Sequence, residues 1–413
     1  MKSTALTPNA RFVPSLAALL LATACTSPGA ASDGGASVTP RPAPSSSSPQ
    51  SAAATPLPSG TPGPKDWAET FQLVNSGVAH LAVVLCDGGG TGTGFLVGED
   101  LIMTAAHVAK NETAINVSVN GQYTTARVMG INDSQDLALL KTAAPVEGHQ
   151  FRFATTTPAQ GVEVAAIGFP LDSGMTFTAG RVSALNQEVD TESGTHRGLI
   201  QTDTALNPGN SGGPLLLMDG SVAGVVSAKR AWVLGTGGTN DYGAEGTGYA
   251  ASGVTAAAQA TDWGKRTTPL PSASCRDHAE TSSSDIITTN NADHEHASGA
   301  IQSLLRHGQA INRAAYEAAF AVFTPAMQAD MKGLSVWSSG LSTSFWRALT
   351  VNSISGTDAE LTVDVILRTE QAAQDGQDGQ TCSDWGLRYT LAWDGDVWRI
   401  AAAESPAGPP KPC

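Results

Sequence analysis

Residues 200–215 read Ile-Gln-Thr-Asp-Thr-Ala-Leu-Asn-Pro-Gly-Asn-Ser-Gly-Gly-Pro-Leu, with Ser211 set between glycines. Glycine lets the backbone turn sharply and approach a ligand closely. Such a turn exposes the Ser211 hydroxyl and aims the backbone N–H groups of Gly209-Asn210-Ser211, chiefly those of Gly209 and Ser211, at one spot, as an oxyanion hole requires. Clusters of Gly, Asn, Ser and Pro are mostly ordinary turns. A catalytic serine therefore requires a histidine and a carboxylate elsewhere in the chain.

Two short motifs upstream supply those groups. His107 ends Thr-Ala-Ala-His after the strand-like run 101–103, and Asp136 opens the apolar run Asp-Leu-Ala-Leu-Leu. Taken singly, such a histidine is more often structural, and such an aspartate is usually a turn or cap residue. Together with Ser211 they match the groups of a serine nucleophile, its base and an orienting carboxylate. We predict that His107, Asp136 and Ser211 are catalytic.

Residues 80–255 resemble the trypsin-like serine peptidases and, within them, the HtrA/Deg branch. The matching segments are 92–97 (Gly-Thr-Gly-Phe-Leu-Val), 104–108, 136–140, 166–170 (Ala-Ile-Gly-Phe-Pro), 178–185 and 200–214. The resemblance implies two six-stranded barrels, with His107 and Asp136 on the first and Ser211 on the second. Val108 stands where many secreted trypsin relatives carry cysteine, which favours the HtrA branch. No downstream segment resembles a PDZ-type domain.

The resemblance also places a substrate pocket. By position in the family's motif, Ala205 and Leu206 fall near the pocket floor, and Val225, Val226 and Ser227 form one wall. The floor carries no acidic residue, so we do not expect a trypsin-like preference for Arg or Lys. We expect cleavage after small or medium apolar residues.

The amino-terminal region has the features of a targeting segment. Lys2 and Arg11 precede an apolar run that ends in Leu-Ala-Thr-Ala-Cys25, which is typical of a signal peptide. This ending resembles the lipobox of bacterial lipoproteins, with Ala22 where leucine is usual, and implies acylation of Cys25 after cleavage. The alternative is a secreted protein with ordinary cleavage. Residues 26–66 are rich in Ser, Pro and Ala and are predicted to be a disordered tether.

Hydrophobic patterning divides the rest of the chain. Short apolar runs separated by turn residues predict an all-β barrel or sandwich over 67–265, closed by a helix over 254–263. Residues 266–298 read as a polar linker. Its Asp-His-Glu-His run at 293–296 lacks further ligands at metal-binding spacing, so we predict neither metal nor cofactor.

Residues 299–405 have helical periodicity first and strands afterwards, which predicts an α+β domain, followed by a tail at 406–413. The segments 314–326, 381–385 and 398–400 resemble the cone-shaped domains similar to nuclear transport factor 2, whose fold is cystatin-like. We interpret this domain as a module for an unidentified protein or small ligand.

Charge and cysteine content restrict the partners. The formal net charge of −14 argues against nucleic acid. Of the five cysteines, four remain once Cys25 is assigned to lipid. We prefer the bridge Cys382–Cys413, which would leave Cys86–Cys275; two other pairings and free thiols stay open.

Two functions are compatible with these features. The first is a serine endopeptidase acting on exported or envelope polypeptides, lipid-anchored at the outer face of a bacterial cell membrane or, alternatively, secreted. The second is a latent peptide-binding adaptor that works through its C-terminal domain. The complete His, Asp, Ser set favours the endopeptidase.

Overall fold

The computed structural model describes residues 63–170, 174–191, 194–229, 232–234, 241–243, 247–275 and 285–413. Residues Thr61–Cys413 form one compact unit. The predicted signal peptide (1–25), the acylation of Cys25 and the tether up to residue 62 lie outside the described residues. Among the described residues, no helix is both long and apolar enough to cross a membrane.

A short helix precedes the first barrel. Helix α1 (Trp67–Val74) begins at Asp66, whose side chain accepts a hydrogen bond from the Glu69 amide, a common N-cap arrangement. The 3-10 turn η1 (Asn75–Gly77) leads into the first strand.

The first barrel is closed, in the strand order β1-β2-β3-β6-β5-β4. Its strands are β1 (Val78–Val84), β2 (Gly89–Leu96), β3 (Leu101–Thr104), β4 (Ala114–Val119), β5 (Gln122–Asn132) and β6 (Leu137–Thr142). Helix α2 (Ala106–Ala109) lies directly after β3. The interior of the barrel is filled by small and branched apolar side chains such as Leu81, Ile102 and Leu140, all fully buried.

The second barrel is also closed, in the order β10-β11-β14-β9-β8-β7. Its strands are β7 (Glu163–Gly168), β8 (Thr176–Thr191), β9 (Gly194–Thr202), β10 (Pro214–Leu216), β11 (Val222–Lys229) and β14 (Gly248–Ser252). A separate two-stranded sheet joins β12 (Trp232–Leu234) and β13 (Asp241–Gly243). The predicted double six-stranded barrel is confirmed.

Helix α3 (Gly253–Trp263) follows the second barrel and returns to the first, close to the predicted bounds. Trp263 packs so tightly on Gly130 of β5 that a Cβ there would lie 2.2 Å from the indole. One buried apolar cluster includes Phe95 and Met103 of the first barrel together with Ile167 and Val225 of the second. The barrels therefore share a continuous core, which holds the site-bearing loops of both in fixed relation.

The C-terminal segment (residues 285–413) has an α+β arrangement. Its elements are β15 (Ile287–Asn290), α4 (Ala297–Asn312), α5 (Tyr316–Ala321), α6 (Pro325–Asp330), α7 (Leu334–Ser338), β16 (Phe345–Gly356), β17 (Glu360–Glu370), η3 (Gln377–Gly379), β18 (Cys382–Trp393), β19 (Trp398–Glu404) and β20 (Lys411–Pro412). The sheet order is β15-β16-β17-β18-β19, with β20 paired to β18. Strand β15 lies inside the stretch predicted as linker and pairs parallel to β16.

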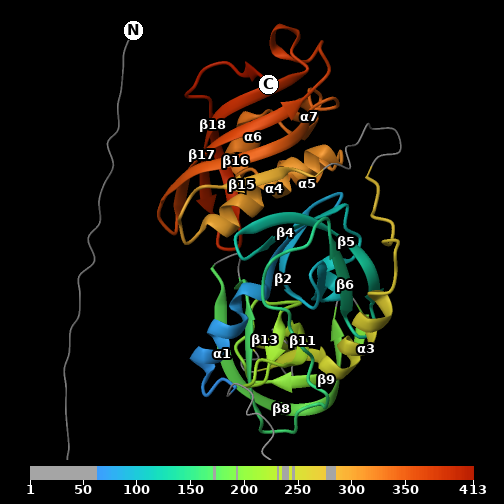
Figure 1. Cartoon of the computed structure of the whole chain (residues 1–413). Helices are drawn as coiled ribbons and strands as arrows, with labels where there is room; N and C mark the ends of the chain where they lie inside the picture. Colours follow the sequence, from blue (N-terminus) through green and yellow to red (C-terminus); the bar gives the residue numbers. More distant parts are fainter. Residues whose placement is uncertain are drawn as a thin grey trace, which may run out of the picture. The chain divides into compact units, whose positions relative to one another are not determined.

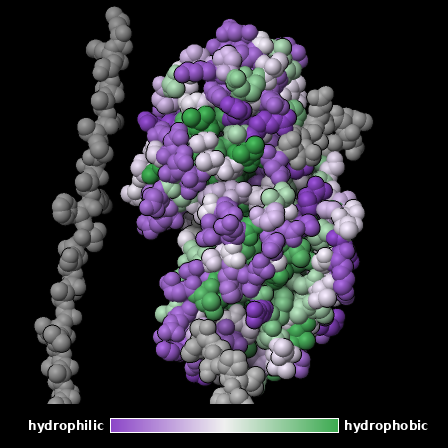
Figure 2. All heavy atoms as spheres, viewed as in Figure 1, coloured by the Kyte–Doolittle hydropathy of each residue, from purple (hydrophilic) through white to green (hydrophobic). Residues whose placement is uncertain are grey.

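Helix α4 lies between this sheet and strands β1 and β4 of the first barrel (Figure 1). Val84 and Ala114 of the barrel belong to the same buried cluster as Ile301 and Leu304 of α4. The Gln302 side chain donates a hydrogen bond to the His80 carbonyl at 3.1 Å. On the face drawn in Figure 2, hydrophilic residues surround smaller hydrophobic groups.

The structure contains both preferred disulfides. Cys86–Cys275 has a Cα–Cα distance of 5.1 Å and Cys382–Cys413 one of 5.5 Å, both ordinary for a disulfide. The first ties the connection after β1 to the segment after α3, and the second ties the chain's last residue to the start of β18.

Candidate active site

The His107 side chain is held by Asp136. Nδ1 of His107 donates to the carboxylate, at 2.8 Å from Oδ2 and 3.0 Å from Oδ1, and the His107 backbone amide donates to Oδ1 at 2.9 Å. Asp136 is 1% exposed whereas His107 is 33% exposed. Because the carboxylate occupies Nδ1, the other ring nitrogen is left to act as an acceptor toward the open side.

Asp136 is fixed by the turn that precedes β6. Its φ is +53°, a left-handed conformation that Asp tolerates better than most residues. The Ser227 hydroxyl donates to Oδ2 at 2.5 Å. Burial alone would raise the pKa of Asp136, but the hydrogen bonds and charge of His107 and the bond from Ser227 hold this pKa below its usual value. Asp136 is therefore a carboxylate at neutral pH.

The Ser211 loop depends on two glycines in the left-handed region. Gly209 has φ +95° and Gly212 has φ +84°. A Cβ on Gly212 would lie 2.1 Å from the Thr104 hydroxyl, so only glycine fits there. The Asn210 amide donates to the Asn207 carbonyl at 3.0 Å. Since that amide is already used, the oxyanion donors in this segment are left to the Gly209 and Ser211 N–H groups.

Thr93 of β2 connects the Ser211 loop to the first barrel through hydrogen bonds. Its amide donates to the Ser211 carbonyl at 2.8 Å, and its hydroxyl donates to the Gly209 carbonyl at 2.7 Å. The same hydroxyl accepts from the Phe169 amide at 3.1 Å, and the Thr93 carbonyl accepts from the Thr104 hydroxyl at 2.7 Å. These bonds orient the peptide planes on both sides of Ser211.

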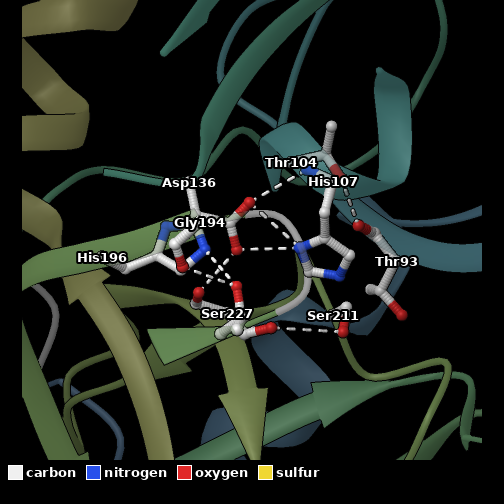
Figure 3. Close-up of polar contacts among 9 residues, drawn as sticks. Thr93, Thr104, His107, Asp136, Gly194, His196, Ser211 and Ser227 are labelled. Carbon is white, nitrogen blue, oxygen red and sulfur yellow. Dashed lines mark hydrogen bonds and ion pairs between the residues drawn. The ribbon is translucent and has the colours of Figure 1, made fainter. Parts of the chain in front are cut away.

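His107 and Ser211 lie beside each other across the junction of the barrels (Figure 3). The Ser211 hydroxyl donates a long hydrogen bond, 3.4 Å, to the Ser227 carbonyl, and its drawn bond does not run to His107. At this length the bond is weak. Rotation of the Ser211 side chain would release the bond to Ser227. The hydrogen bond between a catalytic serine and its histidine is often long or poorly aligned until substrate is bound.

The predicted pocket residues are dispersed. Ala205 is exposed, and its carbonyl accepts from the Thr178 hydroxyl at 2.9 Å. Leu206 and Val226 pack inside the second barrel, and Val225 packs in the core shared by the barrels. Ser227 lies nearest the site: its hydroxyl holds Asp136 and its carbonyl accepts from Ser211.

Sequence reasoning missed the contacts of Thr93 and the link from Ser227 to Asp136. In the sequence, the Gly-Thr-Gly-Phe segment at 92–95 indicates only the family resemblance and does not reveal the role of Thr93. A hydroxyl residue between two glycines was the available signal for a backbone-anchoring role.

A possible metal-binding group lies outside this site. Glu295, His296 and Asp358 each place a ligand atom within 4.8 Å of the others. His296 Nε2 already pairs with Asp358 at 2.8 Å, and that carboxylate is 92% exposed. The hydrogen bond between His296 and Asp358 accounts for their proximity without a metal.

Residues 92–225 match the family model described as a trypsin-like peptidase domain. The chain therefore contains a segment similar to the trypsin-like serine peptidases, and that segment includes His107, Asp136 and Ser211. A probable periplasmic serine endoprotease, DegP-like, from Chlamydia muridarum is 38% identical over 157 residues, which cover 36% of this chain and 29% of the relative. A putative serine protease, HhoB, from Synechocystis sp. is 40% identical over 158 residues, which cover 36% of each chain.

The chain thus spans about a third of the length of these relatives. Among solved structures, a protease from M. tuberculosis in its active form is 22% identical, with a TM-score of 0.43, over 54% of this chain and 99% of that one. An HtrA-type protease, AlgW, with tripeptide is 27% identical, with a TM-score of 0.39, over 47% of this chain and 63% of that one.

Proposed function

We propose that the protein is an extracytoplasmic serine endopeptidase in which Ser211 is the nucleophile, His107 the general base and Asp136 the residue that orients the base. The observation that carries the proposal is the doubly bonded His107–Asp136 pair beside the Ser211 turn. The match to the peptidase family spans all three residues.

The reaction follows from these positions. Oγ of Ser211 attacks the peptide carbonyl as its proton passes to Nε2 of His107. The Gly209 and Ser211 N–H groups stabilise the negative charge on the carbonyl oxygen, where loss of one such donor typically costs about 3 kcal/mol. His107 then protonates the departing amine as the C–N bond breaks, which leaves an acyl-enzyme. Water, deprotonated by His107, attacks the ester and frees Ser211.

Asp136 acts through His107. Its carboxylate holds the proton on Nδ1, so that Nε2 starts as an acceptor, and it stabilises the imidazolium that forms. Ser227 donates to the same carboxylate and keeps it aligned. The low pKa of Asp136 keeps this arrangement intact at neutral pH.

A fluorophosphonate probe tests the proposal, because it reacts with a serine only when the base and oxyanion donors are in place. We expect labelling of the wild-type protein at Ser211, and none of Ser211→Ala or His107→Ala. Folded wild-type protein that resists the probe while binding peptides would instead favour the latent adaptor.

The substrate preference is proposed from the absence of an acidic residue at Ala205 and Leu206. We propose cleavage after small or medium apolar residues. Paired fluorogenic peptides that differ only in Val, Ala or Lys before the scissile bond test this, and equal turnover of the Lys peptide would contradict it.

An extracytoplasmic location is supported by the names of relatives described as periplasmic serine endoproteases and by two disulfides, which persist in oxidising compartments. We further propose an anchor through acylated Cys25. Metabolic labelling with a palmitate analogue should mark the wild-type chain and not Cys25→Ser.

We also propose that the C-terminal segment is a domain similar to nuclear transport factor 2 that binds a protein or small ligand. Its helices α4–α7, followed by the antiparallel strands β16–β19, support this. A pull-down with the full chain, compared with a chain whose α7 surface carries Val336→Glu, tests for a protein partner; Val336 is 57% exposed.

A further inference from the structure

A cavity of about 350 Å³ lies where the first barrel meets the C-terminal segment. Its lining includes charged and hydroxyl side chains from both sides: Arg127, Lys141, Thr142, Thr267, Asp285 and Arg313. This volume is within the range of small-molecule sites.

Two of the cations come from neighbouring strands. Arg127 of β5 is directly opposite Lys141 of β6, so both side chains leave the same face of the barrel. Like charges at such positions repel each other and destabilise the sheet. Lys141 is relieved by an ion pair with Asp100 at 2.9 Å. Among the residues that the structure describes, Arg127 has no ion pair of this kind.

Arg313 approaches from the C-terminal segment, at the end of α4. The Nε atoms of Arg127 and of Arg313 are both buried and both without a hydrogen-bond partner. A buried donor left unpaired destabilises the folded protein, and more so when it is charged. Two guanidinium groups with unpaired Nε atoms at one cavity therefore lower the stability of the folded protein unless a hydrogen-bond acceptor binds them.

The carboxylates nearby do not remove this cost. Glu112 is buried and accepts from the Ser272 hydroxyl at 2.8 Å. Asp285 lines the cavity but does not accept a hydrogen bond from the Nε atom of Arg127 or of Arg313. Burial and the charge of Arg127 lower the pKa of Arg313 in spite of the opposing charges of Asp285 and Glu112. Within the described part of the chain, no side chain at this cavity therefore accepts from the two Nε groups.

We propose that Arg127 and Arg313 bind a small oxyanion, a phosphate or a small carboxylate, in this cavity. The ligand links the first barrel to the C-terminal segment. Guanidinium groups bind such anions in bidentate geometry and remain charged at neutral pH. Asp285 lies at the same cavity and opposes the ligand, which limits the anion charge that the site accepts. This site is separate from the proposed triad, and its test does not depend on proteolysis.

The proposal is tested by calorimetric titration of the full chain with inorganic phosphate and, separately, with citrate. The chloride concentration is held constant in both titrations. We expect saturable binding of at least one of them. Arg127→Met and Arg313→Met should each weaken it roughly 10-fold or more, since each removes a charge-assisted hydrogen bond. Arg127→Lys and Arg313→Lys keep the positive charge but lose the bidentate N–H donors of the guanidinium group. They should weaken anion binding less than the Met variants. Asp285→Asn should tighten it.

Arg197→Met is the matched control, because Arg197 is an exposed arginine paired with Glu188 at 2.9 Å on the second barrel. It should leave binding within about 2-fold of wild type. Binding of phosphate alone or of citrate alone identifies which anion the site takes. Two results would overturn the proposal: no saturable binding of either probe up to about 10 mM, or binding that persists unchanged in the Arg127→Met/Arg313→Met double variant.

Discussion

At the residue scale, Thr93 is one of the residues that join the two halves of the candidate site, together with Ser227. One side chain and its backbone connect β2 to the carbonyls of Gly209 and Ser211 and to the amide of Phe169. The proposed oxyanion donors of the same loop are backbone groups, which no side-chain substitution can remove directly. The geometry of this loop is therefore best tested through Thr93.

Replacement of Thr93 by Val should lower kcat roughly 10-fold to 100-fold with little change in KM, because the Gly209 and Phe169 backbone groups lose their partner and the loop loses alignment. Steady-state kinetics and the rate of fluorophosphonate labelling measure the effect. Thr93→Ser should restore most of the activity.

The matched control is Thr113→Val. Thr113 is a buried threonine whose hydroxyl donates to the Val84 carbonyl at 3.2 Å. Neither Thr113 nor Val84 belongs to the candidate site. It should cost a similar stability, about 1 kcal/mol, without the loss of kcat. An equal fall in kcat for both variants would show that Thr93 acts through stability alone.

Ser227→Ala should raise the pKa of Asp136, because it removes a hydrogen bond to the carboxylate. A carboxylate whose folded pKa lies below its unfolded value of 3.8 adds stability above 3.8, and this is lost as pH falls through the folded pKa. The variant should therefore be less stable by about 1 kcal/mol at neutral pH, with the difference shrinking in acid. Urea unfolding between pH 7 and pH 2 measures it, and a constant difference would contradict the assignment.

At the element scale, α4 is buried on almost every side, including polar residues that periodicity does not place in a core. Gln302 reaches the His80 carbonyl, Asn312 exchanges two hydrogen bonds with the Trp346 backbone, and the Nδ1 of His307 bonds the Ala319 carbonyl at 2.9 Å. These groups take up backbone partners from β1, β16 and α5. The helix therefore depends on specific contacts with three different elements.

His307 makes this helix sensitive to acid. Burial lowers the pKa of His307 from 6.5 to about 4. The unfolded chain takes up the proton first, so stability is lost as pH falls from 6.5 toward 4, by about 3 kcal/mol at most. His307→Gln should be less stable at pH 7.5 but should lose less on acidification. Thermal melts at pH 7.5 and pH 5 test this, and parallel losses in both proteins would contradict it.

At the scale of the whole molecule, two disulfides close loops of very different length. Cys86 and Cys275 are 189 residues apart, and Cys382 and Cys413 are 31 apart. In the chain-entropy account the longer loop restricts the unfolded chain more.

Removal of Cys86–Cys275 by double serine substitution should therefore cost more stability than removal of Cys382–Cys413, by roughly 1.5 kcal/mol. Calorimetric melts of the two double variants make the comparison directly. A larger cost for the Cys382/Cys413 pair would show that local contacts at β18 outweigh the loop term.

Much of the fold was predictable because its signals are local. Short apolar runs with turn residues indicated an all-β barrel or sandwich, and the family resemblance implied two six-stranded barrels. Helical spacing followed by strands indicated the α+β order of the C-terminal segment. The exception is β15, whose four residues carry no strong pattern and acquire strand structure by pairing with β16.

The sequence by itself determined the all-β character of residues 67–265 and the candidates His107, Asp136 and Ser211, because short motifs and residue types carry that information. The structure decided between the disulfide pairings that the sequence left open. Only the tertiary structure decided that Thr93 holds the Ser211 loop, that the resting Ser211 hydroxyl bonds the Ser227 carbonyl, and that Arg127 and Arg313 share a cavity. The physical reason is that a buried polar group takes its partner from strands distant in sequence, which no local pattern specifies.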